Sequence, residues 1–539
     1  MRKIERIFTG ICLISSVVVI SGTMIGYINT AKTPVNTGEV FDTQYGAFLA
    51  AQHAIYVNDY KSAAEFSNVL DKTEYANVKN VRVLSDFLNG KIPDNVADLK
   101  DDKTGAARII YDAHLVLQDE WKAFQNRHKK DTSPLTAPFR IWSGIANDWR
   151  TNTLKFIDTL PTNSSWKAFV RGQIYVELGD IDRANQEFAN VHPDFMNLND
   201  YMYLMSFYNH FGFIEDAKIL HDDFTSRPGG LFLADFDAFP DWSLFSGYKN
   251  QLAFSLVQNV SHTKIMMYSD LSVMHLRFAQ IIAPEFYENN DAIKYYLGQY
   301  FYTNNGNYQD AFEQISSESP FKLFATLRDA ERKKDMVALE KLLDKSPVFV
   351  PALNTVIGNK IKNGERRSAL RIVNRAINDK TISEYGRAFF VKSRAYINYV
   401  FGDLEAAQSD LHDAAEVLHT DADILSLQAK IWAAQNREIQ TAYEYAMGLV
   451  QRNPSDVAAW DTLGCVVAVR EGTLAALDVL ERVGEVSRTQ SSLFERLGDL
   501  YVQTGDKDRA VKSYNRAIEL ADDGLVVVPL IERKLRKIK

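Results

Sequence analysis

The feature that most constrains this chain is a helical pattern that recurs about every 34 residues towards its C-terminus. The clearest unit runs from Ser491 to Gly524. If Ser491 is position 1, large apolar residues occupy positions 4, 7, 11 and 24, and small residues occupy positions 8, 20 and 27. The large residues line one face of each of two helices, and the small ones let those helices pack closely. Gly505 and Asp506 allow the first helix to end and the chain to reverse. The pattern therefore predicts stacked helical hairpins.

Related units extend the pattern through the chain. Further C-terminal units begin at Val457 and Asp423, and near Ala388 and Val350. Less regular hairpins are expected near Ser165, Leu198 and Ala292, and Ala50–Phe66 is typical of a degenerate first hairpin. We predict about ten helix pairs, of which the last five are the most regular.

The sequence resembles tetratricopeptide repeat proteins of the bacterial envelope. The resemblance rests on AAWDTLGCVVAVREG (458–472) and LFERLGDLYVQTGDKDRA (493–510), with Asp522 in place of the consensus proline at position 32. It implies an all-α fold: a right-handed α-solenoid of helix-turn-helix repeats, preceded here by one N-terminal transmembrane or signal helix. It also implies a scaffold that binds protein partners and needs no cofactor.

The N-terminus predicts the compartment. Arg2, Lys3 and Arg6 precede an uncharged run from Ile7 to Ile28. At about 1.5 Å per residue this run is long enough to cross the roughly 30 Å hydrocarbon core of a bilayer. Because basic leaders stay cytoplasmic, we expect an inner-membrane protein with one span and periplasmic repeats. The alternative is a cleaved signal and release into the periplasm.

These patterns divide the chain into expected segments. Residues 1–30 are the anchor or signal, 31–43 a linker and 44–160 irregular helical repeats. Residues 161–345 are degenerate repeats with a loop at 224–242, 346–524 are regular repeats, and 525–539 form a capping helix with a basic tail.

Composition and motifs argue against several functions. The net charge of −8 disfavours nucleic-acid binding, which needs cations to displace phosphate counterions. Searches for the spacings of metalloproteases, phosphate-binding loops and serine hydrolases give no convincing match, so we expect no catalysis and no metal site. Asp235, Asp237 and Asp241 fit solvated acids on a partly buried aromatic loop better than a calcium loop, because Phe236 and Phe239 intervene.

The family resemblance places partner-binding residues on the first helix of each hairpin, at positions 2, 5, 9, 12 and 13. The middle units offer Trp166, Phe169, Gln173, Glu177, Asn199, Met202, Asn209 and His210. The C-terminal units offer Phe389, Lys392, Tyr396, Tyr399, Asp461, Glu495 and Asp499. Aromatic residues among spaced polar groups suit protein recognition.

The leading hypothesis is therefore a non-catalytic scaffold that binds a partner protein at the periplasmic face of the membrane. The alternative is an accessory regulator of an envelope enzyme that binds a glycan or lipid, with the loop at 224–242 lining its pocket.

Overall fold

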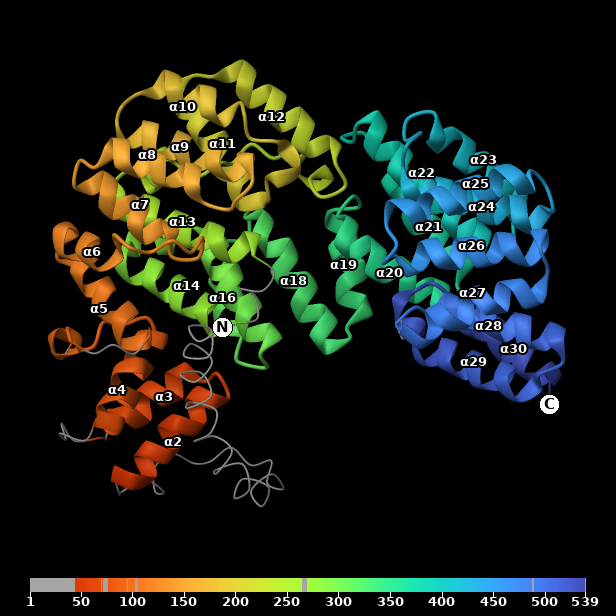
Figure 1. Cartoon of the computed structure of the whole chain (residues 1–539), viewed down its shortest axis with the longest axis horizontal. Coiled ribbons are helices and arrows are strands. Elements are labelled where there is room, and N and C mark those ends of the chain that lie inside the picture. Colours follow the sequence, from red (N-terminus) through yellow and green to blue (C-terminus); the bar gives the residue numbers. More distant parts are fainter. Residues whose placement is uncertain are drawn as a thin grey trace. The chain divides into compact units, whose positions relative to one another are not determined.

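The computed structural model describes residues 44–68, 70, 76–94, 96–101, 105–263, 269–486 and 489–538. Within these ranges every regular element is a helix and there is no strand, as predicted (Figure 1). The predicted membrane or signal segment and its linker, residues 1–43, lie outside the described ranges. Among the described helices, none is long and apolar enough to cross a bilayer. The chain divides into two units, 1–89 and 90–539.

The first unit begins with the hairpin predicted at residues 50–66. It consists of α2 (Gln44–Tyr56) and α3 (Tyr60–Ser67), followed by α4 (Ala76–Leu88), and α2 contacts both other helices. Ala47, Ala51 and Ala54 are almost fully buried, because small side chains let the helices approach closely. Asp59 caps α3 by accepting a hydrogen bond from the Ser62 N–H at 3.1 Å.

The second unit opens with helical hairpins in chain order (Figure 1). After a 3₁₀ turn, η1 (Val96–Leu99), come α5 (Gly105–Leu117), α6 (Trp121–His128), α7 (Ala137–Ala146), α8 (Arg150–Thr159), α9 (Ser164–Glu177), α10 (Ile181–Phe188), η2 (Pro193–Phe195), α11 (Leu198–Phe211) and α12 (Ile214–Ser226). The hairpins predicted near Ser165 and Leu198 are α9–α10 and α11–α12, so both predictions are confirmed. A Cβ atom at Gly172 would lie only 2.3 Å from Phe188 Cε1, which explains the small residue at position 8.

Helix α13 (Tyr248–His262) packs against α7, α9 and α11, the first helices of three of these hairpins. It receives a hydrogen bond from the Trp142 indole at Ser255 (2.9 Å) and one from the Gln173 amide at Gln251 (3.1 Å). The Gln258 amide also donates to Asp200 at 2.7 Å. Because α13 satisfies polar side chains of α7, α9 and α11, it is part of their core.

The next helices continue the series towards the C-terminal repeats. They are α14 (Asp270–Ile282), α15 (Pro284–Asn289), α16 (Asp291–Thr303), α17 (Gln309–Glu313), α18 (Pro320–Lys333) and α19 (Met336–Lys345). The hairpin predicted near Ala292 is α16–α17, and Gly298 lies directly against Phe312. Contacts also continue from α8 to α9 and from α19 to α20, across residues 160 and 345.

The loop between α12 and α13 packs its apolar residues into neighbouring cores. It contains the 3₁₀ turns η3 (Leu231–Leu233) and η4 (Trp242–Phe245). Leu231 is fully buried in a cluster that includes residues of α18 to α22, and the Phe232 ring lies edge-on to Phe349 at 5.2 Å. Asp235, Asp237 and Asp241 are exposed, as expected for solvated acids on a partly buried loop.

The five regular hairpins follow as predicted. They are α20 (Val350–Lys362) with α21 (Arg366–Ile377), α22 (Glu384–Val400) with α23 (Leu404–Ala415), α24 (Ala422–Gln435) with α25 (Ile439–Arg452), α26 (Val457–Arg470) with α27 (Thr473–Val486), and α28 (Ser491–Thr504) with α29 (Lys507–Glu519). Helix α22 begins at Glu384, four residues before the expected Ala388, because Ser383 caps it by accepting from the Gly386 N–H (3.1 Å).

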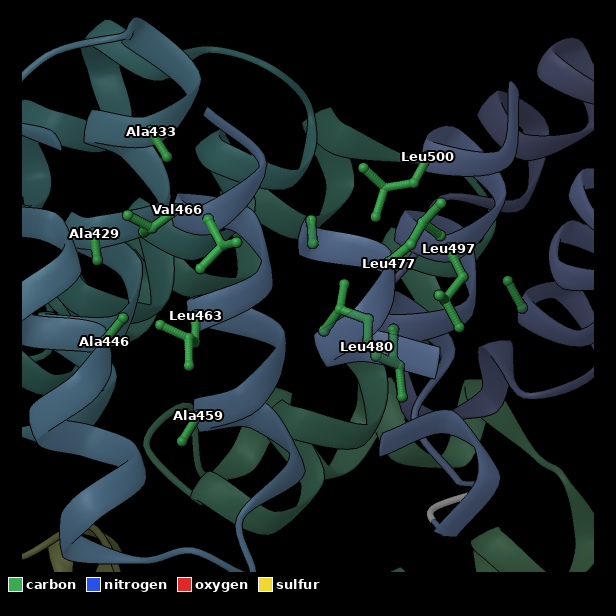
Figure 2. Packing of buried hydrophobic residues seen from close by; sticks show 14 of the residues in the cluster. Ala429, Ala433, Ala446, Ala459, Leu463, Val466, Leu477, Leu480, Leu497 and Leu500 are labelled. Carbon is green, nitrogen blue, oxygen red and sulfur yellow. The ribbon is translucent and has the colours of Figure 1, made fainter. Parts of the chain in front are cut away.

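Glycines set the distance between the two helices of these hairpins. A Cβ atom at Gly464 would lie 2.5 Å from Leu480, and one at Gly498 would lie 2.5 Å from Tyr514. Leu480, Leu463 and Leu497 belong to one buried cluster that spans α24 to α29 (Figure 2). The small residue at position 8 therefore lets the second helix of each of these pairs reach the first.

The C-terminal segment contacts both the last and the first of these five hairpins. After η6 (Ala521–Asp523), residues 524–527 are not helical, and α30 (Val528–Ile538) packs against α29. Val526 and Ile531 are buried in the cluster of α24 to α29, whereas Val527 is buried in the cluster that contains α20 and α22. The predicted cap of the last hairpin is thus also a bridge to α20.

Candidate partner-binding face

The C-terminal hairpins bring their first helices together on one face. Helices α22, α24, α26 and α28 contact one another in order, because each hairpin stacks on the next. Residues about 30 to 35 apart in sequence therefore become neighbours. We call this surface the inner face.

The central group on the inner face is a fully buried carboxylate held by two cations. The Lys430 ammonium donates to Asp461 at 2.8 Å, and the Arg496 guanidinium donates to Asp461 at 2.9 Å. Burial of the Asp461 carboxyl raises its pKa, but the attraction of Lys430 and Arg496 outweighs burial and holds the pKa well below its usual range. The three residues come from α24, α26 and α28, so this ion group joins three consecutive hairpins.

Tyrosines from α22 lie beside this ion group. Burial is the main reason that the pKa values of Tyr396 and Tyr399 are raised, so both hydroxyls stay protonated near neutral pH. The Tyr396 hydroxyl donates to the Leu525 carbonyl oxygen at 3.5 Å. Cys465, on α26, is also buried, and burial raises the pKa of its thiol to about 11, which makes it a poor nucleophile.

The remaining predicted residues of α22 and α28 are engaged in ion pairs and packing. The Lys392 ammonium donates to Asp421 (2.9 Å) and Asp423 (3.0 Å) at the start of α24, and it lies 5.1 Å from the Phe389 ring centre.

On α28, Glu495 and Asp499 both accept hydrogen bonds from Lys534 of α30, each at 2.8 Å. Intramolecular partners therefore already satisfy Lys392, Asp461, Glu495 and Asp499.

The predicted residues of the middle units divide into a buried and an exposed set. Trp166, Phe169, Gln173, Asn199 and Met202 are buried. Phe169 stacks on Phe254 of α13 at 6.0 Å. Glu177 is partly buried and accepts from the Gly247 N–H at 2.9 Å, and burial raises the pKa of its carboxyl.

Asn209 and His210, at the end of α11, are exposed. His210 lies 6.3 Å from Trp242 with the two rings nearly parallel. The structure thus leaves Asn209 and His210 accessible and buries the earlier positions, with α13 covering Phe169 and Gln173. The assignment of these residues to partner binding stays a prediction.

Two charged members of the inner face were missed from the sequence, Lys430 and Arg496. Counting back 34 residues from Val457 gives Asp423 as position 1, which puts Lys430 at the small-residue position 8. Helix α24 in fact begins at Ala422, one residue earlier, because Asp421 caps it by accepting from the Ile424 N–H at 3.1 Å. Had Asp421 been recognised as the cap, Ala422 would be position 1 and Lys430 would fall at position 9, which faces inward.

Arg496 occupies position 6, which the family pattern does not assign to the inner face. Its side chain reaches that face because Asp461, on the preceding hairpin, offers a buried carboxylate. No spacing rule within one repeat could have found it.

Comparisons with known proteins agree with the repeat pattern. The family model described as "Tetratricopeptide repeat" matches residues 491–523, the α28–α29 hairpin. No curated protein matches the chain.

Three solved structures resemble parts of the fold. A tetratricopeptide repeat protein from Parabacteroides merdae is 13% identical, with 54% of this chain and 99% of that chain covered, at a TM-score of 0.31. The APC/C hetero-tetramer Cut9–Hcn1 gives 14% identity, 92% and 96% coverage and a TM-score of 0.29. Yeast Tom70 gives 12% identity, 82% and 96% coverage and a TM-score of 0.30.

Proposed function

Because the chain is a tetratricopeptide repeat protein, we propose that it works as a non-catalytic scaffold that binds a partner protein. The observation that supports this proposal is the continuous stack of first helices from α22 to α28. Such a stack forms one continuous surface across several hairpins, which is the kind of surface that repeat proteins use to bind partners.

Photocrosslinking in intact cells tests the scaffold function. A photoreactive amino acid replaces Ala434, an exposed residue one turn after Lys430 on α24, or Asn354, an exposed residue of α20. The matched control is Lys512, which is exposed on α29, the second helix of its hairpin. We expect one partner protein to be captured at Ala434 or Asn354 and not at Lys512. Equal capture at all three positions, or capture of no protein, would contradict the proposal.

We further propose that the repeats lie at the periplasmic face of an inner membrane, held by residues 7–28. This proposal is supported by the basic leader and the uncharged run that follows it. Alkaline phosphatase fused after the C-terminus should be active, because it folds only outside the cytoplasm, and deletion of residues 1–30 should abolish that activity. An inactive full-length fusion would refute the location and leave the scaffold function intact.

No observation favours the glycan- or lipid-binding alternative. Leu231, Phe232 and Trp242 of its proposed pocket loop pack against other parts of the protein.

A further inference from the structure

A short non-helical strip of the chain lies against helices that are far away in sequence. Residues 524–527 connect η6 to α30, and their neighbours include α20 and α22. The two acids at the end of η6 precede this strip, and together the six residues have the sequence Asp522-Asp523-Gly524-Leu525-Val526-Val527. We call these six residues the C-terminal strip.

The two acids of the C-terminal strip are held by polar groups of two different hairpins. The Lys362 ammonium of α20 donates to Asp522 at 2.5 Å. The Ser491 N–H and hydroxyl, at the start of α28, both donate to Asp523, at 2.7 and 2.6 Å. The Asp522 side chain is 86% exposed, so its pairing with Lys362 lies at the solvent-facing edge of the contact.

The glycine of the strip makes a backbone contact that no other residue could make. A Cβ atom added to Gly524 would lie 2.4 Å from Gly358 Cα on α20. Gly524 also has a positive φ of 71°, which disfavours other residues independently. The surface of α20 therefore selects glycine at this place in whatever segment lies on it.

The two valines of the strip point into separate cores. Val526 is fully buried with residues of α24 to α29, whereas Val527 is buried with residues of α20 and α22. Val527 also approaches the position of a Cβ on Gly364, at 3.7 Å. Residues 526 and 527 are not helical, so these adjacent side chains can enter different cores.

We propose that the surface formed by α20, α22 and the start of α28 is a binding site for a short protein segment that leaves a 3₁₀ turn through a glycine in the left-handed conformation. It takes the pattern acidic–acidic–glycine–apolar–aliphatic–aliphatic, and the chain's own C-terminal strip is its resident occupant. Lys362 and Ser491 bind the two acids. Gly358 leaves room only for a glycine, and Gly364 contacts an aliphatic side chain. The proposal rests on the proposed scaffold function and names the chemistry of the partner segment. Because the C-terminal strip belongs to the same chain, it acts at an effective concentration of about millimolar. A partner segment must therefore carry the same pattern and displace the strip.

A labelled synthetic peptide tests the site directly. The probe is ELADDGLVVVPLIE, residues 519–532, with fluorescein at its N-terminus. The receptor is the full chain with Val526→Asp and Val527→Asp, which expel the strip and leave Gly358, Lys362 and Ser491 unchanged. We expect this variant to bind the peptide at least 10-fold more tightly than the wild-type chain does. A peptide with Gly524→Ala should bind at least 10-fold more weakly. The added receptor change Lys362→Glu should weaken binding by a smaller factor, because the pairing with Asp522 is exposed to solvent.

Two results would overturn the proposal. The first is a helical double-valine variant that fails to bind the peptide. The second is equal binding of the glycine and alanine peptides. Photocrosslinking at Ala434 tests the scaffold function separately, so failure of the peptide assay would leave that function standing.

If the double-valine variant does not fold, hydrogen exchange of the wild-type chain tests whether the strip leaves its site. We expect the helical amides of α30 to exchange at least 10-fold faster than those of α28, because release of the strip frees α30 while α28 stays folded. Equal protection of the two helices would refute the proposal, since the site would then open only when the hairpins unfold.

Discussion

Replacing Gly524 by alanine tests whether the C-terminal strip is in backbone contact with α20. Gly505 is a close control, because it also follows a helical turn in the same hairpin and has a positive φ of 80°. A Cβ atom at Gly505 meets no atom within 4 Å, whereas one at Gly524 lies 2.4 Å from Gly358 Cα. The two substitutions therefore share a conformational cost and differ in steric overlap.

The expected magnitudes follow from this difference. An alanine in the left-handed region costs roughly 1–2 kcal/mol of stability, and both variants bear this cost. Ordinary contacts at a Cβ begin at 3.4 Å, so the backbone of the strip or of α20 must move by about an ångström in Gly524→Ala. Overpacking of this kind costs roughly a further 1–3 kcal/mol. For a cooperative region of ordinary domain size, that difference lowers the melting temperature by roughly 2–12 °C.

Circular dichroism melts of the wild-type chain and both variants measure this difference. Hydrogen exchange locates it, because α30 and the end of α20 should lose protection in Gly524→Ala and keep it in Gly505→Ala. Equal melting temperatures for the two variants would show that the strip does not touch Gly358, and would remove the basis for the glycine selectivity of the proposed site.

Three other predictions concern buried groups. Asp461→Asn should lower the free energy of unfolding by about 3–5 kcal/mol, because Lys430 and Arg496 lose their shared carboxylate. The control Asp423→Asn changes an exposed acid and should lower it far less, and denaturant titrations measure both values. Burial lowers the pKa of His275 to about 4, so the folded state resists protonation and loses stability as pH falls from about 6.5 towards 4. The melting temperature of His275→Leu should fall less over that pH interval than that of the wild-type chain. If the two melting temperatures fall in parallel, burial of His275 does not cause the pH dependence. Leu231→Ala should cost about 2–5 kcal/mol by leaving a cavity between η3 and α22, whereas a value near zero would show that the loop does not pack there.

Local spacing determined the repeats, because each hairpin closes through contacts between residues near in sequence. Gly498 against Tyr514 and Gly464 against Leu480 are such contacts, and the small residue at position 8 predicted the close approach of the two helices at both places. Helix ends were less certain, because caps decide them: Ser383 starts α22 four residues early, and Asp421 shifts α24 by one residue.

The tertiary structure decided which predicted surfaces stay open. Helix α13 buries Phe169 and Gln173, and Lys534 pairs with Glu495 and Asp499, although no repeat pattern relates these partners. The contact between Gly524 and Gly358 likewise joins residues more than four repeats apart. By itself, the sequence determined a stack of helical hairpins with an inward face, because 3.6-residue periodicity and small residues are local properties. Only the fold decided what covers that face, because long-range packing depends on how all the hairpins together place segments that are distant in the chain.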